Sequence, residues 1–197
     1  AFSLVITTND SLVGVRDPQG FRPLCLGKTA NGYVLSSESC AFDAIKAEFI
    51  RHIDPGEMVI IDDSGVRSTV YAEPEKIDKK LCVFEYIYFA RGDSHIDGQS
   101  VYQSRLNMGR ELYKETKYDA DIVMSIPDSG TTAALGYARA SGIPFAEGLV
   151  KNRYSGRTFI KPNQEERELA VRMKLNALPH VVSGKRIVLI DDSIVRG

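Results

Sequence analysis

The stretch Lys185-Arg-Ile-Val-Leu-Ile-Asp-Asp-Ser-Ile-Val-Arg-Gly197 decides the predicted fold of this chain. Its apolar, mostly β-branched run Ile187–Ile190 predicts a strand that is buried on both faces of a parallel sheet. Asp191 and Asp192 follow directly, and in open α/β sheets ligands bind beyond the carboxyl ends of the strands. The loop 193–197 then offers backbone N–H groups, a hydroxyl and a basic side chain to a phosphate. The stretch therefore predicts a sugar-phosphate site, in which carboxylates bind ribose hydroxyls or a hard cation such as Mg²⁺.

The alternative interpretation of this stretch is a core strand that ends in turn-forming acids. The chain contains a second copy of the tripeptide in Ile60-Ile-Asp-Asp-Ser-Gly65. There the alternating residues 66–71 follow, which predicts a hairpin turn between antiparallel strands. The C-terminal copy is followed by an apolar and basic loop instead. Context therefore favours a functional role for the C-terminal copy alone.

A second buried strand is predicted at Asp121-Ile-Val-Met-Ser-Ile126, followed by the loop Pro127-Asp-Ser-Gly-Thr-Thr132 and a helix over 133–140. Gly142 and Pro144 are stop signals for that helix. A strand, a hydroxyl-rich loop and a helix start form the layout of an anion site. Ser and Thr also cap helices that bind no ligand. The second loop of this kind after a parallel strand favours the anion site.

The segment Val150-Lys-Asn-Arg-Tyr-Ser-Gly-Arg-Thr-Phe-Ile-Lys-Pro162 gathers basic residues without any periodicity. A basic, glycine-containing loop in a chain of formal net charge −1 could close over a polyanionic substrate. The alternative is a solvated loop that pairs with Glu165, Glu166 and Glu168. The neighbouring motifs favour the functional interpretation. Residues 164–178 are then predicted to form a helix.

The first third of the chain predicts strands, one helix and strands again, as in an α+β layer. Hairpins are expected over residues 2–16 and 57–71, and the spacing of Phe42, Ile45, Phe49 and Ile53 predicts an amphipathic helix over 40–52. Ser37 or Ser39 could cap this helix. The charged run 72–80 is the predicted linker, and residues 101–116 predict a further helix.

No catalytic constellation is evident in this third. His52 stands alone and is interpreted as a helix-end residue. Arg16, Asp17 and Arg22 could bind a substrate, but charged residues in a turn rich in Gly and Pro more often tie loops together.

Composition indicates an ordinary globular protein, with 43% hydrophobic and 26% charged residues. The formal net charge of −1 gives no electrostatic reason to expect nucleic acid or an anionic membrane as a partner. No apolar stretch approaches the roughly 20 residues that span a bilayer. Cys25, Cys40 and Cys82 are scattered and odd in number, which argues against a disulfide framework and favours the cytoplasm.

Taken together, the motifs in 127–132, 150–162 and 185–197 resemble those of the type I phosphoribosyltransferases, which use phosphoribosylpyrophosphate (PRPP). The Ser-Ile-Val-Arg-Gly ending is similar to that of the amidophosphoribosyltransferases of purine synthesis. Gly14-Val-Arg-Asp-Pro-Gln-Gly-Phe-Arg-Pro-Leu24 and Val34-Leu-Ser-Ser-Glu-Ser39 resemble late segments of the glutaminase domain of that family. The resemblance covers nearly the whole chain, in family order.

The resemblance implies two domains: residues 1–75 as the C-terminal portion of an N-terminal-nucleophile (αββα) glutaminase, and residues 76–197 as the first portion of a parallel-sheet phosphoribosyltransferase. It implies formation of 5-phosphoribosylamine, glutamate and pyrophosphate from PRPP, glutamine and water. No catalytic residue is assigned, because the nucleophile of that glutaminase is a cysteine at the mature N-terminus and is expected upstream. The implied PRPP-binding residues are Asp128, Ser129, Gly130, Thr131, Lys151, Arg153, Tyr154, Arg157, Asp191, Asp192, Ser193, Ile194, Val195, Arg196 and Gly197.

The resemblance also implies cofactors and partners. Ser129, Asp191 and Asp192 would bind Mg²⁺, and Cys82 is a candidate ligand of a [4Fe-4S] cluster or, equally, a buried structural thiol. Further implied partners are glutamine, purine nucleotides as feedback inhibitors, and other copies of the chain in a homo-oligomer. Neither nucleic acid nor a membrane is expected.

Two other classes of function remain open at this point. One is a base-salvage phosphoribosyltransferase or a PRPP synthetase, which shares the acidic strand end; the segments 16–24 and 36–39 count against it. The other is a nucleotide-sensing module that keeps the fold without turnover.

Overall fold

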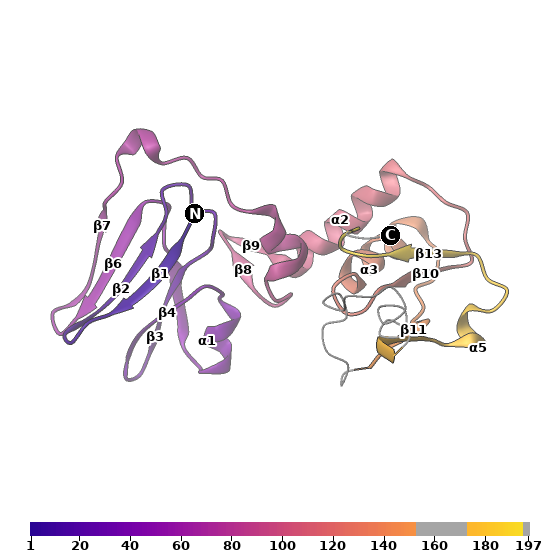
Figure 1. Cartoon of the computed structure of the whole chain (residues 1–197), viewed down its shortest axis with the longest axis horizontal. Coiled ribbons are helices and arrows are strands. Elements are labelled where there is room, and N and C mark those ends of the chain that lie inside the picture. Colours follow the sequence, from indigo (N-terminus) through magenta and orange to yellow (C-terminus); the bar gives the residue numbers. More distant parts are fainter. Residues whose placement is uncertain (153–172, 195–197) are drawn as a thin grey trace, which may run out of the picture. The chain divides into compact units, whose positions relative to one another are not determined.

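The computed structural model describes residues 1–152 and 173–194. The chain forms two compact units, Ala1–Ser104 and Arg105–Gly197, whose helices and strands are labelled in Figure 1. These two units are defined by how the chain packs. The predicted boundary between residues 75 and 76 is a different one, because it separates two domains by their function, and it stays a prediction.

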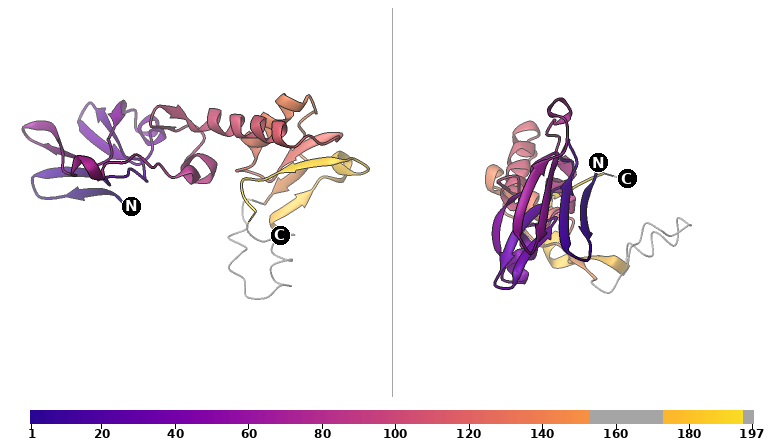
Figure 2. Two further views of the ribbon diagram at one scale, coloured as in Figure 1. Left: turned by 90° about the horizontal axis from the view of Figure 1, so that it is seen from above. Right: turned by 90° about the vertical axis from the view of Figure 1, so that its left-hand side faces the viewer.

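The first unit contains a four-stranded antiparallel sheet. Its strand order is β1-β2-β6-β7, and Figure 2 shows β1 at one edge. These strands are β1 (Ser3–Thr7), β2 (Ser11–Arg16), β6 (Glu57–Asp62) and β7 (Gly65–Val70). Thr7 pairs with Leu12, and Asp62 pairs with Gly65 across a tight turn. Both predicted hairpins are therefore confirmed.

A second, three-stranded antiparallel sheet shares a core with the first one. Its order is β4-β3-β5, with β3 (Cys25–Thr29), β4 (Gly32–Ser36) and β5 (Glu48–His52). Leu24 and Ile53, next to β3 and β5, are buried against Val59 of β6. The apolar core of this unit therefore lies between the two sheets.

The predicted helix over 40–52 is wrong in its second half. Helix α1 spans only Cys40–Ala44, Lys46 has a positive φ of 55°, and β5 follows. The apolar spacing was helical, but pairing with β3 places Glu48–His52 in the sheet, and tertiary pairing overrides such local signals. Ser39 is at the N-cap position but makes no capping bond. Its Oγ accepts a hydrogen bond from the backbone N–H of His95 at 2.8 Å instead.

The first unit also includes the chain beyond the predicted linker. After η1 (Pro74–Lys76) come the π-helix η2 (Glu85–Phe89) and the short hairpin of β8 (His95–Ile96) and β9 (Gln99–Ser100). Ala90, Ile96 and Val101 form a small buried cluster there. The chain then enters α2 (Val101–Glu115), as predicted.

The second unit is built on two parallel strands. β10 (Ile122–Ser125) pairs with β13 (Ile187–Ile190), with Ile122 opposite Ile187 and Ser125 opposite Ile190. Helix α3 (Thr131–Ser141) packs against both strands (Figure 1), and Val123, Tyr137 and Val188 belong to the buried core between them. Both strands and the helix after β10 are confirmed. Elsewhere in the described part of this unit, β11 (Leu149–Lys151) pairs antiparallel with β12 (Leu175–Ala177), and the short α5 (Pro179–Val182) follows.

Two expectations in this unit are corrected. β13 is not buried on both faces: Ile187 is 38% exposed and Leu189 52%, while Val188 and Ile190 are buried. Only the face toward α3 is covered by the described residues. The predicted helix over 164–178 lies mostly outside the described residues. Met173 and Lys174 are helical as predicted, but Leu175–Ala177 forms β12 because it pairs with β11.

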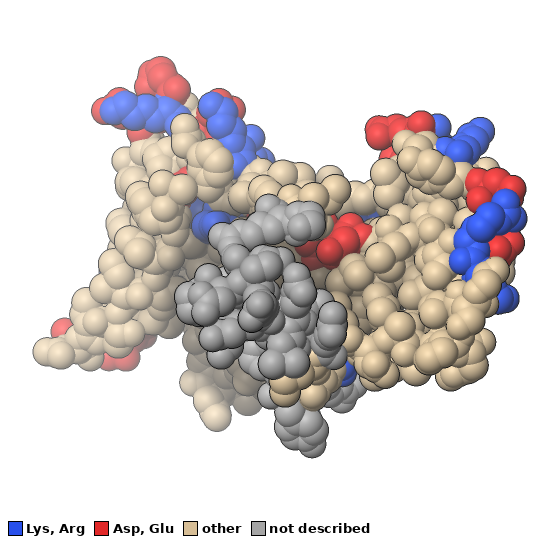
Figure 3. All heavy atoms as spheres, turned by 45° about the vertical axis from the view of Figure 1, so that its right-hand side comes forward, with Lys and Arg blue, Asp and Glu red and all other residues tan. Residues whose placement is uncertain are grey.

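Charged side chains of both signs lie close together on the face shown in Figure 3. This agrees with the formal net charge of −1. Within residues 1–152 and 173–194, no helix is long and apolar enough to cross a membrane.

Glu57 makes the first unit sensitive to acid. Its carboxylate accepts hydrogen bonds from both Nη atoms of Arg51, at 2.8 and 2.5 Å, and from the backbone N–H of Asp54 at 2.8 Å. Burial alone would raise the pKa of Glu57, but Arg51 and the Asp54 amide outweigh it and hold the pKa below its ordinary value. A lowered pKa adds stability above the unfolded-state pKa of about 4.3, and this is lost as the pH falls through the folded-state pKa.

We therefore expect Glu57→Gln to lower the free energy of unfolding by about 2 kcal/mol at pH 7. The difference from the parent should shrink below about pH 4, where the parent carboxylate is itself protonated. Urea unfolding at pH 7 and pH 3 measures both. Glu73→Gln, which removes an exposed pair with Lys76, is the control and should cost less than about 0.5 kcal/mol. An equal loss at both pH values would contradict the assignment.

Candidate functional site

The carboxyl ends of β10 and β13 lie next to each other. Ser125 and Ile190, the last residues of the two strands, are register partners, and the Ile126 N–H donates to the Ile190 carbonyl at 2.9 Å. The loop after each strand therefore starts at the same edge of the sheet. This is the edge at which ligands bind in parallel α/β sheets.

Gly130 brings these two loops into direct contact. A Cβ atom at this position would lie 2.7 Å from the Ile190 carbonyl oxygen and 3.2 Å from the Asp191 Cα. Both distances are too short for a side chain. The glycine is therefore what allows the loop before α3 to pass against the acidic loop after β13.

The start of α3 suits an anion. Gly130 is at the N-cap position and no side chain caps the helix. The Thr131 N–H donates to the Asp128 carbonyl at 3.3 Å, and the N–H groups of a helix start are in general a favourable place for an anion. The hydroxyls of Ser125 and Thr131 are hydrogen-bonded to each other, 3.1 Å apart. This bond joins the end of β10 to the start of α3 and fixes the shape of the loop between them.

The predicted acidic residues lie at the end of β13 as expected. The Asp192 N–H donates to Asp191 Oδ1 at 2.8 Å, and the Ser193 hydroxyl donates to Asp192 Oδ1 at 2.5 Å. Burial, together with the charge of Asp192, raises the pKa of Asp191. A bound cation or donated ribose hydroxyls would relieve this repulsion. The pair is therefore better suited to binding a ligand than to stabilising the fold.

Lys151 is also brought to this edge. It ends β11, and its Nζ forms an ion pair with Asp128 Oδ2 at 2.6 Å. Lys151 and Asp128 were predicted separately as ligands, but their pairing was not predicted. The sequence indicated this pairing only indirectly, through the opposite charges of two residues predicted for one site. Asp128 holds an ammonium group beside the start of α3, where an anion would bind.

The remaining predicted ligands divide into two groups. Ser129 lies in the loop before α3, and Ser193 and Ile194 are exposed after β13. The other predicted ligands lie outside the described residues: Arg153, Tyr154, Arg157, Val195, Arg196 and Gly197.

The residues at this edge fit Mg²⁺ in part. Asp191, Asp192 and Ser129 offer the oxygen ligands that this ion prefers. Over residues 1–152 and 173–194, no three His, Cys, Asp or Glu residues come together as a metal site. The ion would thus be bound by the carboxylates together with water and phosphate oxygens, which is its usual mode in phosphate sites.

The described residues do not fit an iron–sulfur cluster by themselves. Cys25 and Cys40 are buried in the first unit, and burial raises the pKa of Cys25 to about 12. A cluster needs four thiolates, and Cys82 alone supplies one. A thiol with a raised pKa is also a poor nucleophile.

The other Asp-Asp-Ser copy forms the predicted turn. Ser64 donates to Asp62 Oδ1 from its N–H at 2.9 Å and from its hydroxyl at 2.5 Å, and Arg67 pairs with Asp62 at 2.6 Å. These bonds close the hairpin between β6 and β7. The turn predicted for this copy is therefore confirmed, whereas a functional role of the C-terminal copy stays a prediction.

The residues that could bind a substrate in the first third also have structural roles. Arg16 and Asp17 are buried, and Arg22 forms an ion pair with Glu85. Asp17 accepts hydrogen bonds from the backbone N–H groups of Phe2, Gln19 and Phe21. They tie loops together, which is the interpretation that the sequence favoured.

The fold and the site define a class. The chain is a mixed α/β protein with acidic and hydroxyl-rich loops at the adjoining carboxyl ends of two parallel strands. No family model matches the chain.

Over its full length the chain is similar to part of the curated amidophosphoribosyltransferases. It is 52% identical over 197 residues to the protein of Archaeoglobus fulgidus and 56% identical over 201 residues to that of Synechococcus elongatus. It spans 43% and 40% of those two proteins. The chain is therefore a homologue, over its whole length, of a segment of the amidophosphoribosyltransferases.

Solved structures give the same result. The glutamine PRPP amidotransferase of B. subtilis, complexed with ADP and GMP, is 49% identical and superimposes with a TM-score of 0.89. The match covers 98% of this chain and 42% of that protein. A structure described as the allosteric regulatory enzyme of purine biosynthesis matches with a TM-score of 0.90 and the same identity.

Proposed function

We propose that this chain forms part of a glutamine PRPP amidotransferase and carries much of its PRPP site. The whole enzyme would hydrolyse glutamine and use the ammonia to displace pyrophosphate from C1 of PRPP. The products are 5-phosphoribosylamine, pyrophosphate and glutamate. The observation that carries the proposal is the direct contact between the Gly130 loop and the backbone of Asp191.

The contacts support a division of PRPP among the three loops. The loop 127–130 and the start of α3 would bind pyrophosphate through backbone N–H groups and hydroxyls, with Lys151 adding positive charge. Asp191 and Asp192 would accept hydrogen bonds from the ribose hydroxyls. The following loop, which begins at Ser193, would bind the 5′-phosphate.

Charge stabilisation is the main chemical requirement of this reaction. Displacement at C1 develops positive charge on the ribose and negative charge on the departing pyrophosphate. Acids beside the ribose and donors beside the pyrophosphate match that distribution, and rigid strand ends hold both groups in place. Mg²⁺, when bound, would neutralise the leaving group further.

The remaining features of the proposal concern the whole protein. Residues 1–75 would belong to an N-terminal-nucleophile glutaminase domain and residues 76–197 to a type I phosphoribosyltransferase domain. The B. subtilis relative was solved with ADP and GMP, which supports purine nucleotides as inhibitors here. A homo-oligomer, a cytoplasmic location and a cluster at Cys82 stay predictions.

Pyrophosphate release tests the function. We expect the full-length protein to release pyrophosphate from PRPP when Mg²⁺ and either glutamine or ammonium chloride are supplied. Release that depends instead on a purine base would identify a salvage enzyme. PRPP or nucleotide binding without any release would identify a sensing module. Either result would contradict the proposal.

A further inference from the structure

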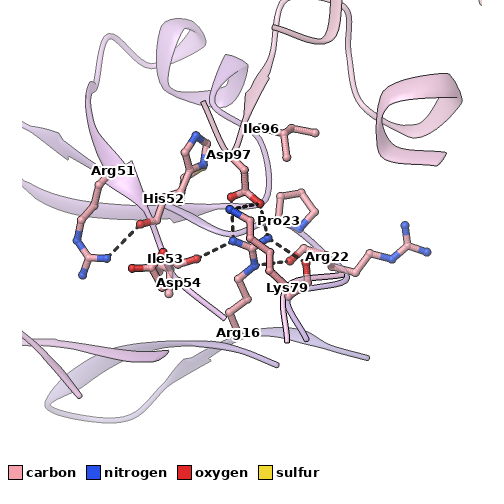
Figure 4. Close-up of polar contacts among 12 residues, drawn as sticks. Arg16, Arg22, Pro23, Arg51, His52, Ile53, Asp54, Lys79, Ile96 and Asp97 are labelled. Carbon is pink, nitrogen blue, oxygen red and sulfur yellow. Dashed lines mark hydrogen bonds and ion pairs between the residues drawn. The ribbon is translucent and has the colours of Figure 1, made fainter. Parts of the chain in front are cut away.

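Arg16 is fully buried, and its guanidinium group makes five hydrogen bonds. Its Nε donates to the Arg22 carbonyl at 2.9 Å, its Nη1 to the Ile53 carbonyl at 2.8 Å, and its Nη2 to the Gly20 carbonyl at 3.0 Å. The two remaining N–H groups donate to the two carboxylate oxygens of Asp97, both at 3.1 Å (Figure 4). Every N–H group of the guanidinium therefore has an acceptor.

Asp97 reaches Arg16 from a distant part of the sequence. It lies at the turn between β8 and β9, has a positive φ of 47°, and precedes Gly98, which has a φ of 83°. An Asp-Gly pair with positive φ is the typical turn of a two-residue hairpin. The Asp97 side chain is 8% exposed, and Lys79 pairs with the same carboxylate at 3.3 Å. The hairpin thus places the Asp97 carboxylate against Arg16 of the first sheet.

Further contacts join the same two parts of the chain. Glu38 Oε2 accepts hydrogen bonds from the Arg91 N–H at 2.8 Å and from the Ser94 hydroxyl at 2.7 Å. Arg22 pairs with Glu85 at 2.5 Å. All these contacts connect residues before the predicted linker 72–80 with residues after it. Together with the Arg16–Asp97 pair they form what we call the Arg16 clamp.

We propose that the Arg16 clamp is a positioning device that couples the two half-reactions of the enzyme. It fixes the entry segment of the transferase portion, residues 81–100, to the glutaminase portion. The inference rests on the proposed function, in which ammonia made in one portion must be used in the other.

The buried charge gives the clamp its specificity. A buried arginine is tolerated only when its charge is compensated and its donors are satisfied. The hairpin is therefore held in one register, because any other position would leave Arg16 unpaired. Surface pairs give no such constraint. Arg91 and Asp93, 67% and 52% exposed, form a pair of that ordinary kind within the same segment.

Asp97→Asn in the full-length protein tests the coupling. Asn also adopts positive φ, so the turn is kept while the carboxylate charge is lost. We expect pyrophosphate released per glutamate formed, with glutamine as the nitrogen source, to fall on the order of tenfold. Glutamate formation and ammonia-dependent pyrophosphate release should stay within about twofold of the parent, because neither needs transfer between the portions.

Two further variants make the outcome unambiguous. Asp93→Asn, the matched control, should leave the ratio of pyrophosphate to glutamate unchanged. Glu38→Gln weakens the clamp without exposing Arg16, and should lower the ratio in the same direction if Asp97→Asn fails to fold. An unchanged ratio in both Asp97→Asn and Glu38→Gln would overturn the coupling role. A parent protein without ammonia-dependent release would instead overturn the proposed function.

Discussion

Replacing Asp191 and Asp192 together by asparagine should abolish PRPP binding, with a loss of affinity of at least about 100-fold. The two residues directly follow β13, and the backbone of Asp191 lies against the loop that would hold pyrophosphate. Their hydrogen bonds are to their own neighbours, Asp192 N–H and the Ser193 hydroxyl. They contribute little to the packing of the unit, so the loss should concern the ligand and not the fold.

The physical reason for this loss is charge. Burial raises the pKa of Asp191, and repulsion by the adjacent Asp192 carboxylate adds to this. Ribose hydroxyls and Mg²⁺ relieve the repulsion, whereas asparagine amides would offer weaker acceptors and no charge. Titration calorimetry of the full-length protein with PRPP and Mg²⁺ measures the affinity. Unfolding temperatures of the variant and the parent should agree within a few degrees.

The chain contains its own control for this experiment. Asp62→Asn with Asp63→Asn changes the same Asp-Asp-Ser tripeptide at the turn between β6 and β7. We expect unchanged PRPP affinity there, with a small loss of stability as the Asp62–Arg67 pair is removed. Equal PRPP affinity in the Asp191 and Asp192 variant and in this control would contradict the assignment of the site.

Gly136→Ala should destabilise the second unit by about 3 kcal/mol. A Cβ atom at this position in α3 would lie 2.1 Å from the Leu106 carbonyl oxygen of α2. Gly109 of α2 faces α3 in the same manner, because its Cβ would lie 1.8 Å from the Ala133 carbonyl oxygen. The two helices approach each other at glycines, and any side chain there must push them apart.

This expectation opposes intrinsic helix propensity. Alanine favours a helix over glycine by about 1 kcal/mol, so Gly136→Ala would stabilise an isolated helix. Backbone atoms cannot move aside as a flexible side chain can, so the clash should exceed this gain. Thermal unfolding of the full-length protein measures the result. Gly92→Ala, where a Cβ meets nothing within 4 Å, is the control and should change stability by less than about 0.5 kcal/mol. A stabilised Gly136→Ala variant would show that the helices are farther apart.

The parts of the fold that the sequence predicted are those coded by short, continuous signals. The apolar run before Asp191 and the run before Pro127 are strands because each is bounded by polar turn residues. Their loops were predicted as neighbours because parallel strands end at one edge of a sheet. The two hairpins of the first unit followed from alternation and turn residues in the same way.

The parts that were missed depend on pairing between distant residues. β5 had helical apolar spacing, yet β3 pairs with it and makes it a strand. The Lys151–Asp128 and Arg16–Asp97 pairs join residues that no local pattern connects. The exposure of Ile187 and Leu189 was missed as well, because an apolar run does not reveal which face of its strand is packed against other residues.

The central claim is that PRPP lies across the adjoining ends of β10 and β13. A crystal structure of the full-length protein with PRPP and Mg²⁺ tests it most directly. We expect the pyrophosphate at the start of α3 beside Lys151, and the ribose hydroxyls within hydrogen-bond distance of Asp191 and Asp192. PRPP bound at any other place, with this edge of the sheet holding only water, would contradict the account.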